Sequence, residues 1–232
     1  MKKLVLFDFD GTVADSAPDL ANSANTLRLE RDLEPLSVDY LRPYASMGAR
    51  GLIWATLGLR PDEAGYAEAH QRFLRHYEKN LDVDTQLFEG MGELLRTLTR
   101  HNLPWGIVTN KAEHLTRPIM KHLGIYEDCA VLVGGDSTPY LKPHPAALFR
   151  AVKLFDIPSE QCIYIGDDER DIVSAQVAGM SSIVAAYGYC QFAPEIHDWG
   201  ADAIANHPDE IFPIVQQWAE QLKPVAKQPV RS

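Results

Sequence analysis

Two carboxylates directly follow a short apolar run near the N-terminus. The run at residues 4–7 leads into the pentapeptide DFDGT at residues 8–12. If the run is a strand, the i, i+2 spacing of Asp8 and Asp10 points both side chains the same way. Like charges this close raise each other's pKa and persist where a cation compensates them or a proton is shared. A turn with solvated acids is the simpler alternative, but the whole pentapeptide behind an apolar strand favours a functional site.

Further polar side chains follow two later segments. Thr109 and Asn110 end the apolar run that begins at Trp105, so a hydroxyl and an amide would reach one edge of a sheet. Capping of the next helix is an equally good use for them. In the segment LKPHP at residues 141–145, two prolines stiffen the backbone around Lys142. A lysine fixed in this way suits the oxygens of a phosphate group.

The segment GDDERD at residues 166–171 follows another apolar run and is rich in acids. The dipole of a following helix accounts for acids in its first turn. It accounts less well for Asp167, which comes directly after the run and so joins Asp8 and Asp10. Three carboxylates that converge with one lysine predict an oxygen-rich Mg²⁺ site with phosphate as a shared ligand.

The elements that must position these residues alternate along the chain. Apolar runs of strand length are typical of strands buried on both faces of a parallel sheet. They occupy residues 4–7, 105–109, 130–133, 162–165 and 182–186, with a sixth, edge strand at 201–205. Amphipathic helices are predicted between them at residues 89–101, 112–123, 145–155 and 170–178. This series predicts an α/β fold, a doubly wound parallel Rossmann-like sheet.

The first strand is followed by a long segment with helical patterns and no strand pattern. Helices are predicted at residues 20–33, 38–57 and 62–79, with prolines between them. We expect residues 17–82 to form a helical cap, inserted into a core of residues 1–16 and 83–222. A cap placed after the first strand would cover the carboxyl edge of the sheet, where open α/β sheets bind ligands. Residues 223–232 are expected to be a frayed tail.

Composition limits the partners. The 232 residues include 22 Lys and Arg against 32 Asp and Glu, a formal net charge of −10. This argues against binding to nucleic acid or to an anionic membrane and favours a small-molecule partner. The three cysteines are widely spaced, and no apolar segment is long enough for a signal peptide or membrane helix. We therefore expect a cytoplasmic protein. The sequence leaves its oligomeric state open between a monomer and a homodimer.

In this order, the four segments resemble the motifs of the haloacid dehalogenase superfamily. DFDGT resembles the nucleophile motif, Thr109 the second motif, Lys142 the third, and GDDERD at residues 166–171 the fourth. Most of the chain is similar to phosphoglycolate phosphatases. The segments at residues 88–91, 105–111, 187–189 and 199–202 look most like the bacterial N-acetylmuramic acid 6-phosphate phosphatases.

The resemblance implies a mechanism and a set of roles. Asp8 would attack phosphorus to form an aspartyl phosphate, and Asp10 would act as the general acid and base. Mg²⁺ would be held by Asp8, the main-chain carbonyl of Asp10 and Asp167. Thr109, the amide of Asn110 and Lys142 would hold the phosphoryl oxygens. Asp171 would orient Lys142 or a water on the metal.

The resemblance also implies a substrate contact in the cap. The loop SMGARG at residues 46–51 looks like the specificity loop of these caps, and Arg50 could clamp a substrate carboxylate. A solvent-exposed arginine in a glycine-flanked turn is equally consistent with the sequence. The expected substrate is N-acetylmuramic acid 6-phosphate, with 2-phosphoglycolate as the alternative.

Two more remote interpretations remain open on the sequence alone. A sugar phosphomutase shares both aspartates and differs in passing the phosphoryl group to a sugar instead of to water. A phospho-aspartate receiver module also gathers acids, a threonine and a lysine around Mg²⁺. Its phosphoacceptor would not lie in a DxDGT motif on the first strand, and it would have no inserted cap.

Overall fold

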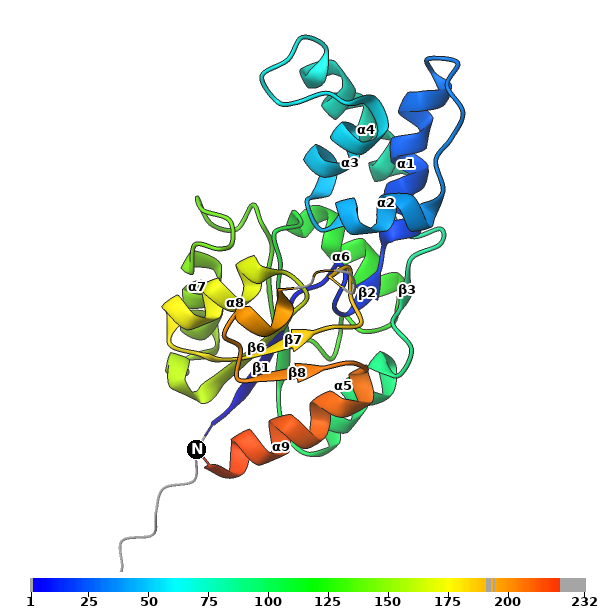
Figure 1. Ribbon diagram of the computed structural model, residues 1–232. Coiled ribbons are helices and arrows are strands. Elements are labelled where there is room, and N and C mark those ends of the chain that lie inside the picture. Colours follow the sequence, from blue (N-terminus) through cyan, green and yellow to red (C-terminus); the bar gives the residue numbers. More distant parts are fainter. Residues whose placement is uncertain (1, 191–192, 194, 222–232) are drawn as a thin grey trace, which may run out of the picture.

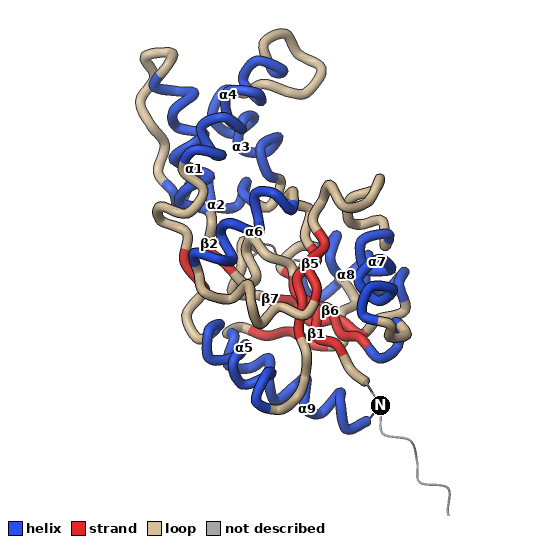
Figure 2. The backbone as a smooth tube through the Cα atoms, turned by 180° about the vertical axis from the view of Figure 1, so that it is seen from behind, coloured by secondary structure: helices blue, strands red, loops and turns tan. Residues whose placement is uncertain are grey.

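The structure is a computed structural model that describes residues 2–190, 193 and 195–221. The tail expected at residues 223–232 lies outside the described residues. Figure 1 shows two groups of elements: a sheet with helices on both faces, and four helices that lie together beyond one end of the sheet. Figure 2, seen from behind, shows the strands enclosed between helices.

The sheet has six parallel strands in the order β5-β4-β1-β6-β7-β8. The strands are β1 (Leu4–Phe7), β4 (Trp105–Val108), β5 (Val131–Val133), β6 (Cys162–Gly166), β7 (Ser181–Ala185) and β8 (Ala203–Ala205). All six coincide with predicted strands to within two residues. A separate antiparallel pair, β2 (Ala14–Asp15) and β3 (Gln86–Leu87), was not predicted.

Alternate residues of each strand enter different cores. In β1, Val5 and Phe7 belong to one hydrophobic cluster, whereas Leu4 and Leu6 belong to another. The first cluster includes side chains of α5 (Met91–Arg100), α6 (Glu113–His122) and α9 (Ile211–Gln221). The second includes side chains of α7 (Ala146–Phe155) and α8 (Glu169–Ala178). Helices on both faces confirm the predicted doubly wound fold and explain why the strands are continuously apolar.

The four remaining α-helices pack on one another through a third hydrophobic cluster. They are α1 (Ala17–Leu29), α2 (Val38–Ala45), α3 (Gly48–Leu57) and α4 (Tyr66–Lys79). Leu115 from α6 and Tyr189 from the segment after β7 join this cluster. The helical group is therefore packed directly against the sheet-bearing part. Three short 3₁₀ helices complete the described elements: Ser159–Gln161, Ile196–Asp198 and Pro208–Glu210.

Some boundaries in the helical group differ from those predicted. The helix predicted at residues 38–57 is two helices, because Gly48 adopts a positive φ of 60° where the second one begins. The helix predicted from residue 62 begins at Tyr66, after Gly65 with φ of 90°. Glycine tolerates this region of backbone space, so it is a natural place for a helix to break or begin.

Helix α9 was not predicted. Its buried residues Ile211, Val215 and Trp218 have the spacing of one helical face. Pro213 obscures this pattern in the sequence, but it lies in the first turn, where a missing amide hydrogen removes no intrahelical bond. Across the part of the chain that the structure describes, no helix is long and apolar enough to cross a membrane.

Candidate active site

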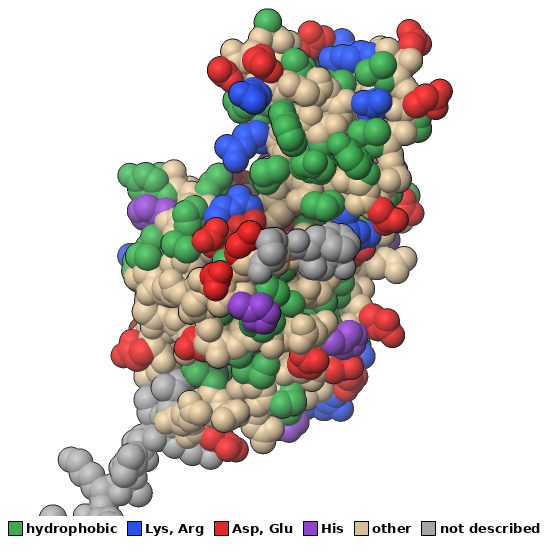
Figure 3. Space-filling model, in the orientation of Figure 1, with side chains coloured by type: hydrophobic (Ala, Val, Ile, Leu, Met, Phe, Trp, Pro, Cys, Tyr) green, Lys and Arg blue, Asp and Glu red, His purple; other side chains and the backbone are tan. Residues whose placement is uncertain are grey.

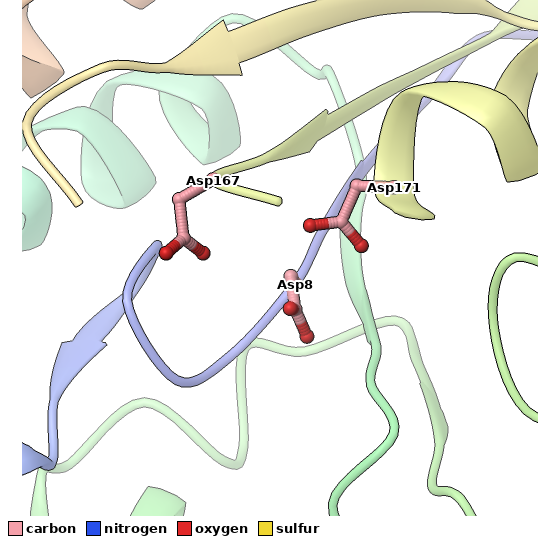
Figure 4. A group of neighbouring side chains, drawn as sticks. All are labelled: Asp8, Asp167 and Asp171. Atoms are coloured by element: carbon pink, nitrogen blue, oxygen red, sulfur yellow. The ribbon is translucent and has the colours of Figure 1, made fainter. Parts of the chain in front are cut away.

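Three carboxyl groups meet where strands β1 and β6 end. Asp8 follows β1, Asp167 follows β6, and Asp171 lies in the first turn of α8. One oxygen of each lies within 4.8 Å of the others. Figure 4 shows the three side chains converging from these separate elements. Parallel neighbouring strands that end at one edge bring together residues far apart in sequence.

Asp167 is a buried carboxylate held by two hydrogen bonds. Its Oδ1 accepts a hydrogen bond from Thr12 Oγ1 at 2.9 Å, and its Oδ2 accepts one from the Tyr189 amide at 3.0 Å. Gly11, with φ of 81°, passes so close that a Cβ there would lie 2.2 Å from the Asp167 Oδ2. Only glycine fits this position, for steric and conformational reasons together.

The environment of Asp167 favours a nearby cation. Burial, reinforced by the charges of Asp8 and Asp171, raises its pKa well above the ordinary value. No ion pair to a described basic side chain compensates Asp167, unlike Asp8 and Asp171. A cluster of carboxylate oxygens with excess negative charge suits a hard divalent cation such as Mg²⁺. Asp8 and Asp167 therefore fit the predicted metal site, whereas Asp10 was expected to contribute only its carbonyl oxygen.

Lys142 is a buried ammonium that lies between two of these acids. Its Nζ is 3.0 Å from Asp8 Oδ1 and 2.6 Å from Asp171 Oδ1, and it also donates to Tyr164 Oη at 2.7 Å. Burial disfavours the charged ammonium, but the two carboxylates outweigh it and raise the Lys142 pKa. Lys142 is therefore held as a fixed positive charge beside Asp8. The expected contact between Asp171 and Lys142 is present.

The predicted residues at the end of β4 differ in what they contact. The side-chain amide of Asn110 accepts from the Lys142 amide at 2.8 Å and donates to the Lys142 carbonyl at 3.2 Å. It therefore fixes the loop that carries Lys142. Thr109 is buried and lines the cavity beside Asp8, and its hydroxyl accepts from the Lys111 amide at 3.2 Å. The helix-capping alternative is not observed, because Ala112 is the residue preceding α6.

Asp10 has different partners from Asp8. Its Oδ1 lies 3.1 Å from Lys111 Nζ and accepts a hydrogen bond from Ser16 Oγ at 2.5 Å. Lys111 is buried and also donates to Tyr77 Oη, on α4, at 2.5 Å. Burial disfavours the Lys111 charge, but Asp10 and Tyr77 outweigh it and raise the Lys111 pKa. The second carboxylate of the motif is thus linked to the helical group.

Asp168 and Arg170 also connect the two groups of elements. Asp168 caps the N-terminus of α8, and its Oδ2 accepts from Ser46 Oγ at 2.7 Å. Arg170 pairs with Asp168 and donates from Nη2 to the Ser46 carbonyl at 2.7 Å. Burial raises the Asp168 pKa, but the hydrogen bonds and charge of Arg170 outweigh it and leave that pKa below its ordinary value. From the sequence, Asp168 was expected only to interact with the dipole of the following helix.

A cavity of about 320 Å³ lies between the sheet edge and the helical group. Asp8, Asp10, Lys142 and Thr109 line it from the sheet side. The loop at residues 46–49 lines it from the other side, together with apolar side chains of Leu20, Phe73, Leu74 and Leu115. This volume is within the range of small-molecule sites.

Arg50, the predicted substrate contact, does not line this cavity. It lies at a neighbouring hollow on the helical group, whose wall also includes Trp54 and Arg60. Met47 borders both spaces. The site residues that sequence analysis missed are Lys111, Tyr77 and Arg170. Their signal was weak, because a single lysine or arginine beside a motif more often lies in solvent.

Comparison with known proteins places this geometry in a family. The model of a family described as haloacid dehalogenase-like hydrolase matches residues 5–185. The chain belongs to this family. The matched span includes all four motif segments, from DFDGT to the acids at the start of α8. The predicted resemblance is therefore confirmed.

Relatives of this hydrolase have two names. A phosphoglycolate phosphatase of Xanthomonas campestris pv. campestris (strain 8004) is 40% identical over 90% of this chain and 95% of its own. An N-acetylmuramic acid 6-phosphate phosphatase of Pseudomonas putida is 35% identical over 92% of this chain and 96% of its own. A crystal structure of a predicted phosphoglycolate phosphatase from Haemophilus somnus has a TM-score of 0.81 at 28% identity, covering 93% of this chain and 98% of that one. The chain is a phosphatase of the haloacid dehalogenase-like hydrolases.

Proposed function

We propose that this phosphatase hydrolyses a small phosphomonoester through an aspartyl phosphate on Asp8. The position of Asp8 carries the proposal: it lines the cavity, contacts Lys142 and lies within the acidic group at the sheet edge. A carboxylate in this position has access to a substrate from the cavity and a fixed positive charge beside it. Residues 17–82 act as the cap that closes the cavity.

The chemistry has two displacement steps. An Asp8 oxygen attacks phosphorus, the bond from phosphorus to the substrate oxygen breaks, and Asp10 gives its proton to that oxygen. Water then attacks phosphorus, the bond to Asp8 breaks, and Asp10 takes a proton from the water. Lys142 stabilises charge on the phosphoryl oxygens throughout.

Other residues hold the phosphoryl group and the metal. The Thr109 hydroxyl and the main-chain amide of Asn110 donate hydrogen bonds to the phosphoryl oxygens. The Asn110 side chain is not used for this, because it holds the loop that carries Lys142. The carboxylates of Asp8 and Asp167, together with the main-chain carbonyl oxygen of Asp10, would hold Mg²⁺. When bound, the ion offsets the negative charge of the phosphate and of these acids.

For the substrate we propose N-acetylmuramic acid 6-phosphate, with 2-phosphoglycolate as the second candidate. The names of the relatives support both. The size of the cavity and its apolar wall favour the amino sugar acid, because the two-carbon frame of phosphoglycolate offers little surface to Leu20, Phe73 and Leu115.

The test is phosphate release by the purified protein given each compound at equal concentration with Mg²⁺. We expect a clearly higher kcat/KM for N-acetylmuramic acid 6-phosphate. Preferential hydrolysis of 2-phosphoglycolate would reverse the ranking. Transfer of the phosphoryl group to a sugar instead of water would replace the hydrolase proposal with a mutase.

A further inference from the structure

Three basic side chains line the cavity, and they are not equivalent. They are Lys111, Lys142 and Arg170. Lys142 and Lys111 are almost completely buried, with side chains that are 2% and 6% exposed. The Arg170 side chain is 35% exposed. A substrate that enters the cavity therefore reaches Arg170 with the least displacement of protein groups.

The two lysines are already committed to other groups. The Lys142 ammonium contacts Asp8 and Asp171, and it donates to Tyr164 Oη and, at 3.3 Å, to the Val108 carbonyl. These four acceptors already exceed its three hydrogens. Its place beside Asp8 assigns it to the phosphate end of a substrate. Lys111 contacts the other acid of the DFDGT segment, Asp10, and the Tyr77 hydroxyl. Neither lysine is suited to a second anionic group.

Two protein groups orient the Arg170 guanidinium and leave some of its N–H donors unused. Its Nε and Nη2 donate to the two oxygens of Asp168, each at 2.7 Å, and Nη2 also donates to the Ser46 carbonyl. The other terminal nitrogen, Nη1, donates to none of the residues that the structure describes. A planar guanidinium held along one edge presents its remaining hydrogens in a fixed direction, which suits a carboxylate.

The location of Arg170 suits the end of a substrate opposite the phosphate. It rises from the first turn of α8 next to Asp171, the partner of Lys142, and reaches the cap at Ser46. Figure 3 shows basic and acidic side chains together at the junction between the helical group and the rest of the molecule. A molecule with its phosphate at Asp8 and its other end toward the cap loop would meet Arg170.

We propose that Arg170, and not Arg50, selects substrates by binding a carboxylate carried by the phosphomonoester. This rests on the proposed function and narrows it to phosphomonoesters that also bear a carboxylate. Asp168 and Ser46 position the guanidinium. Arg50 lies at the neighbouring hollow and does not contribute to this selection.

The test uses two substrates that differ only in the lactyl ether that carries the carboxylate. N-acetylmuramic acid 6-phosphate carries a lactyl ether that N-acetylglucosamine 6-phosphate lacks. Arg170→Met should lower kcat/KM for the first compound about 100-fold, the effect of losing a charge-assisted contact. It should lower kcat/KM for the second by less than about 3-fold. Arg170→Lys, which keeps the charge without the fork, should show an intermediate and equally selective loss.

Matched variants separate binding from positioning. Ser46→Ala removes only the hydroxyl that binds Asp168 and so loosens the positioning of Arg170. It should lower the ratio of the two kcat/KM values in the same direction as Arg170→Met, but by less. Arg50→Ala should leave the ratio of the two kcat/KM values unchanged. An equal loss on both substrates in Arg170→Met would overturn the proposal and make Arg170 a support of the cap loop. If the ratio of the two kcat/KM values falls in Arg50→Ala and not in Arg170→Met, the residue that binds the substrate carboxylate is Arg50.

Failure of the substrate proposal is recognised separately. If the wild-type protein prefers 2-phosphoglycolate, the same variants are compared on that compound and on ethyl phosphate, which lacks the carboxylate. A selective loss on 2-phosphoglycolate in Arg170→Met would then support the role of Arg170 on a different substrate. Should Arg170→Met fail to fold, Arg170→Lys decides the question by the same ratio.

Discussion

Asp8 faces conflicting requirements at the level of single residues. In its proposed role as nucleophile it would have to be ionised, yet it lies near Asp167 and Asp171, whose carboxyl groups are buried. Lys142 relieves this conflict on one side, because its ammonium contacts both Asp8 and Asp171. On the other side, Asp167 remains for a metal ion. The arrangement places a fixed ammonium beside Asp8 while Asp8 still lines the cavity.

Asp8→Asn should abolish turnover, because an amide is a poor nucleophile and a weak metal ligand. We expect kcat to fall by at least about 10³-fold. The measurement is phosphate release, with thermal unfolding to show that the variant folds. Asp128→Asn, at an exposed position away from the cavity, is the matched control and should retain normal activity. Normal turnover by Asp8→Asn would exclude the aspartyl phosphate.

Lys142→Met should affect stability as well as catalysis. The substitution leaves Asp8 and Asp171 without their buried partner, which should lower the free energy of unfolding by about 3 kcal/mol. It should also lower kcat by about 10²-fold or more, because no fixed charge remains for the phosphoryl oxygens. Urea unfolding and steady-state kinetics measure the two effects. Unchanged kinetics in a destabilised protein would restrict Lys142 to a structural role.

At the scale of elements, Asp19 links the two chain segments that join the helical group to the sheet-bearing part. Asp19, in the first turn of α1, accepts hydrogen bonds from the amides of Asp84 and Thr85 and from the Thr85 hydroxyl. The chain enters the helical group just before Asp19 and leaves it just before Asp84. The Asp19 carboxylate therefore holds the entering and the leaving segment together. The short strands β2 and β3, which belong to the same two segments, also pair with each other.

Asp19→Ala should destabilise the protein because it leaves the buried amide hydrogen of Thr85 without its acceptor. We expect the free energy of unfolding to fall by about 2 kcal/mol. Thr85→Val removes only the hydroxyl contact and should cost about 1 kcal/mol, which makes it the graded control. Both values come from urea unfolding. Equal stability of wild type and Asp19→Ala would show that the connection is held by other contacts.

For the whole molecule, the balance of charge in the cavity points to the metal. The side chains of Asp8, Asp10, Asp168 and Asp171 line it together with those of Lys111, Lys142 and Arg170. Asp167, buried just behind Asp8, adds a further carboxylate. A phosphate brings still more negative charge to this region. A divalent cation would supply the compensation that the protein's own basic residues do not.

Mg²⁺ should therefore stabilise the folded protein as well as support its activity. The unfolding temperature of the wild type should rise with Mg²⁺ concentration, because the ion binds only the folded state. Asp167→Asn should gain little stability from Mg²⁺, because an amide replaces the carboxylate that would bind the ion. Chelation should stop phosphate release by the wild type. An equal Mg²⁺ effect on both proteins would place the metal elsewhere.

Local chemistry was enough to predict much of this protein. The apolar runs predicted all six strands of the sheet, since a strand buried on both faces has to be apolar at every position. Acids directly after two of these runs identified Asp8 and Asp167, because the carboxyl ends of parallel strands lie at one edge. The family resemblance led to the expectation that Asp171 would orient Lys142 or a water on the metal, and its carboxylate contacts Lys142.

The partners of these residues across the cavity depended on the tertiary structure. Arg170 reaches Ser46, and Lys111 reaches Tyr77, between segments whose separation in sequence says nothing about their distance in space. The break before α3 depended on the backbone of Gly48, which the helical pattern of the neighbouring residues concealed. Sequence determined which residues could do chemistry and which edge of the sheet they would reach. The packing of the helical group on that edge decided which basic side chain remained open to a substrate.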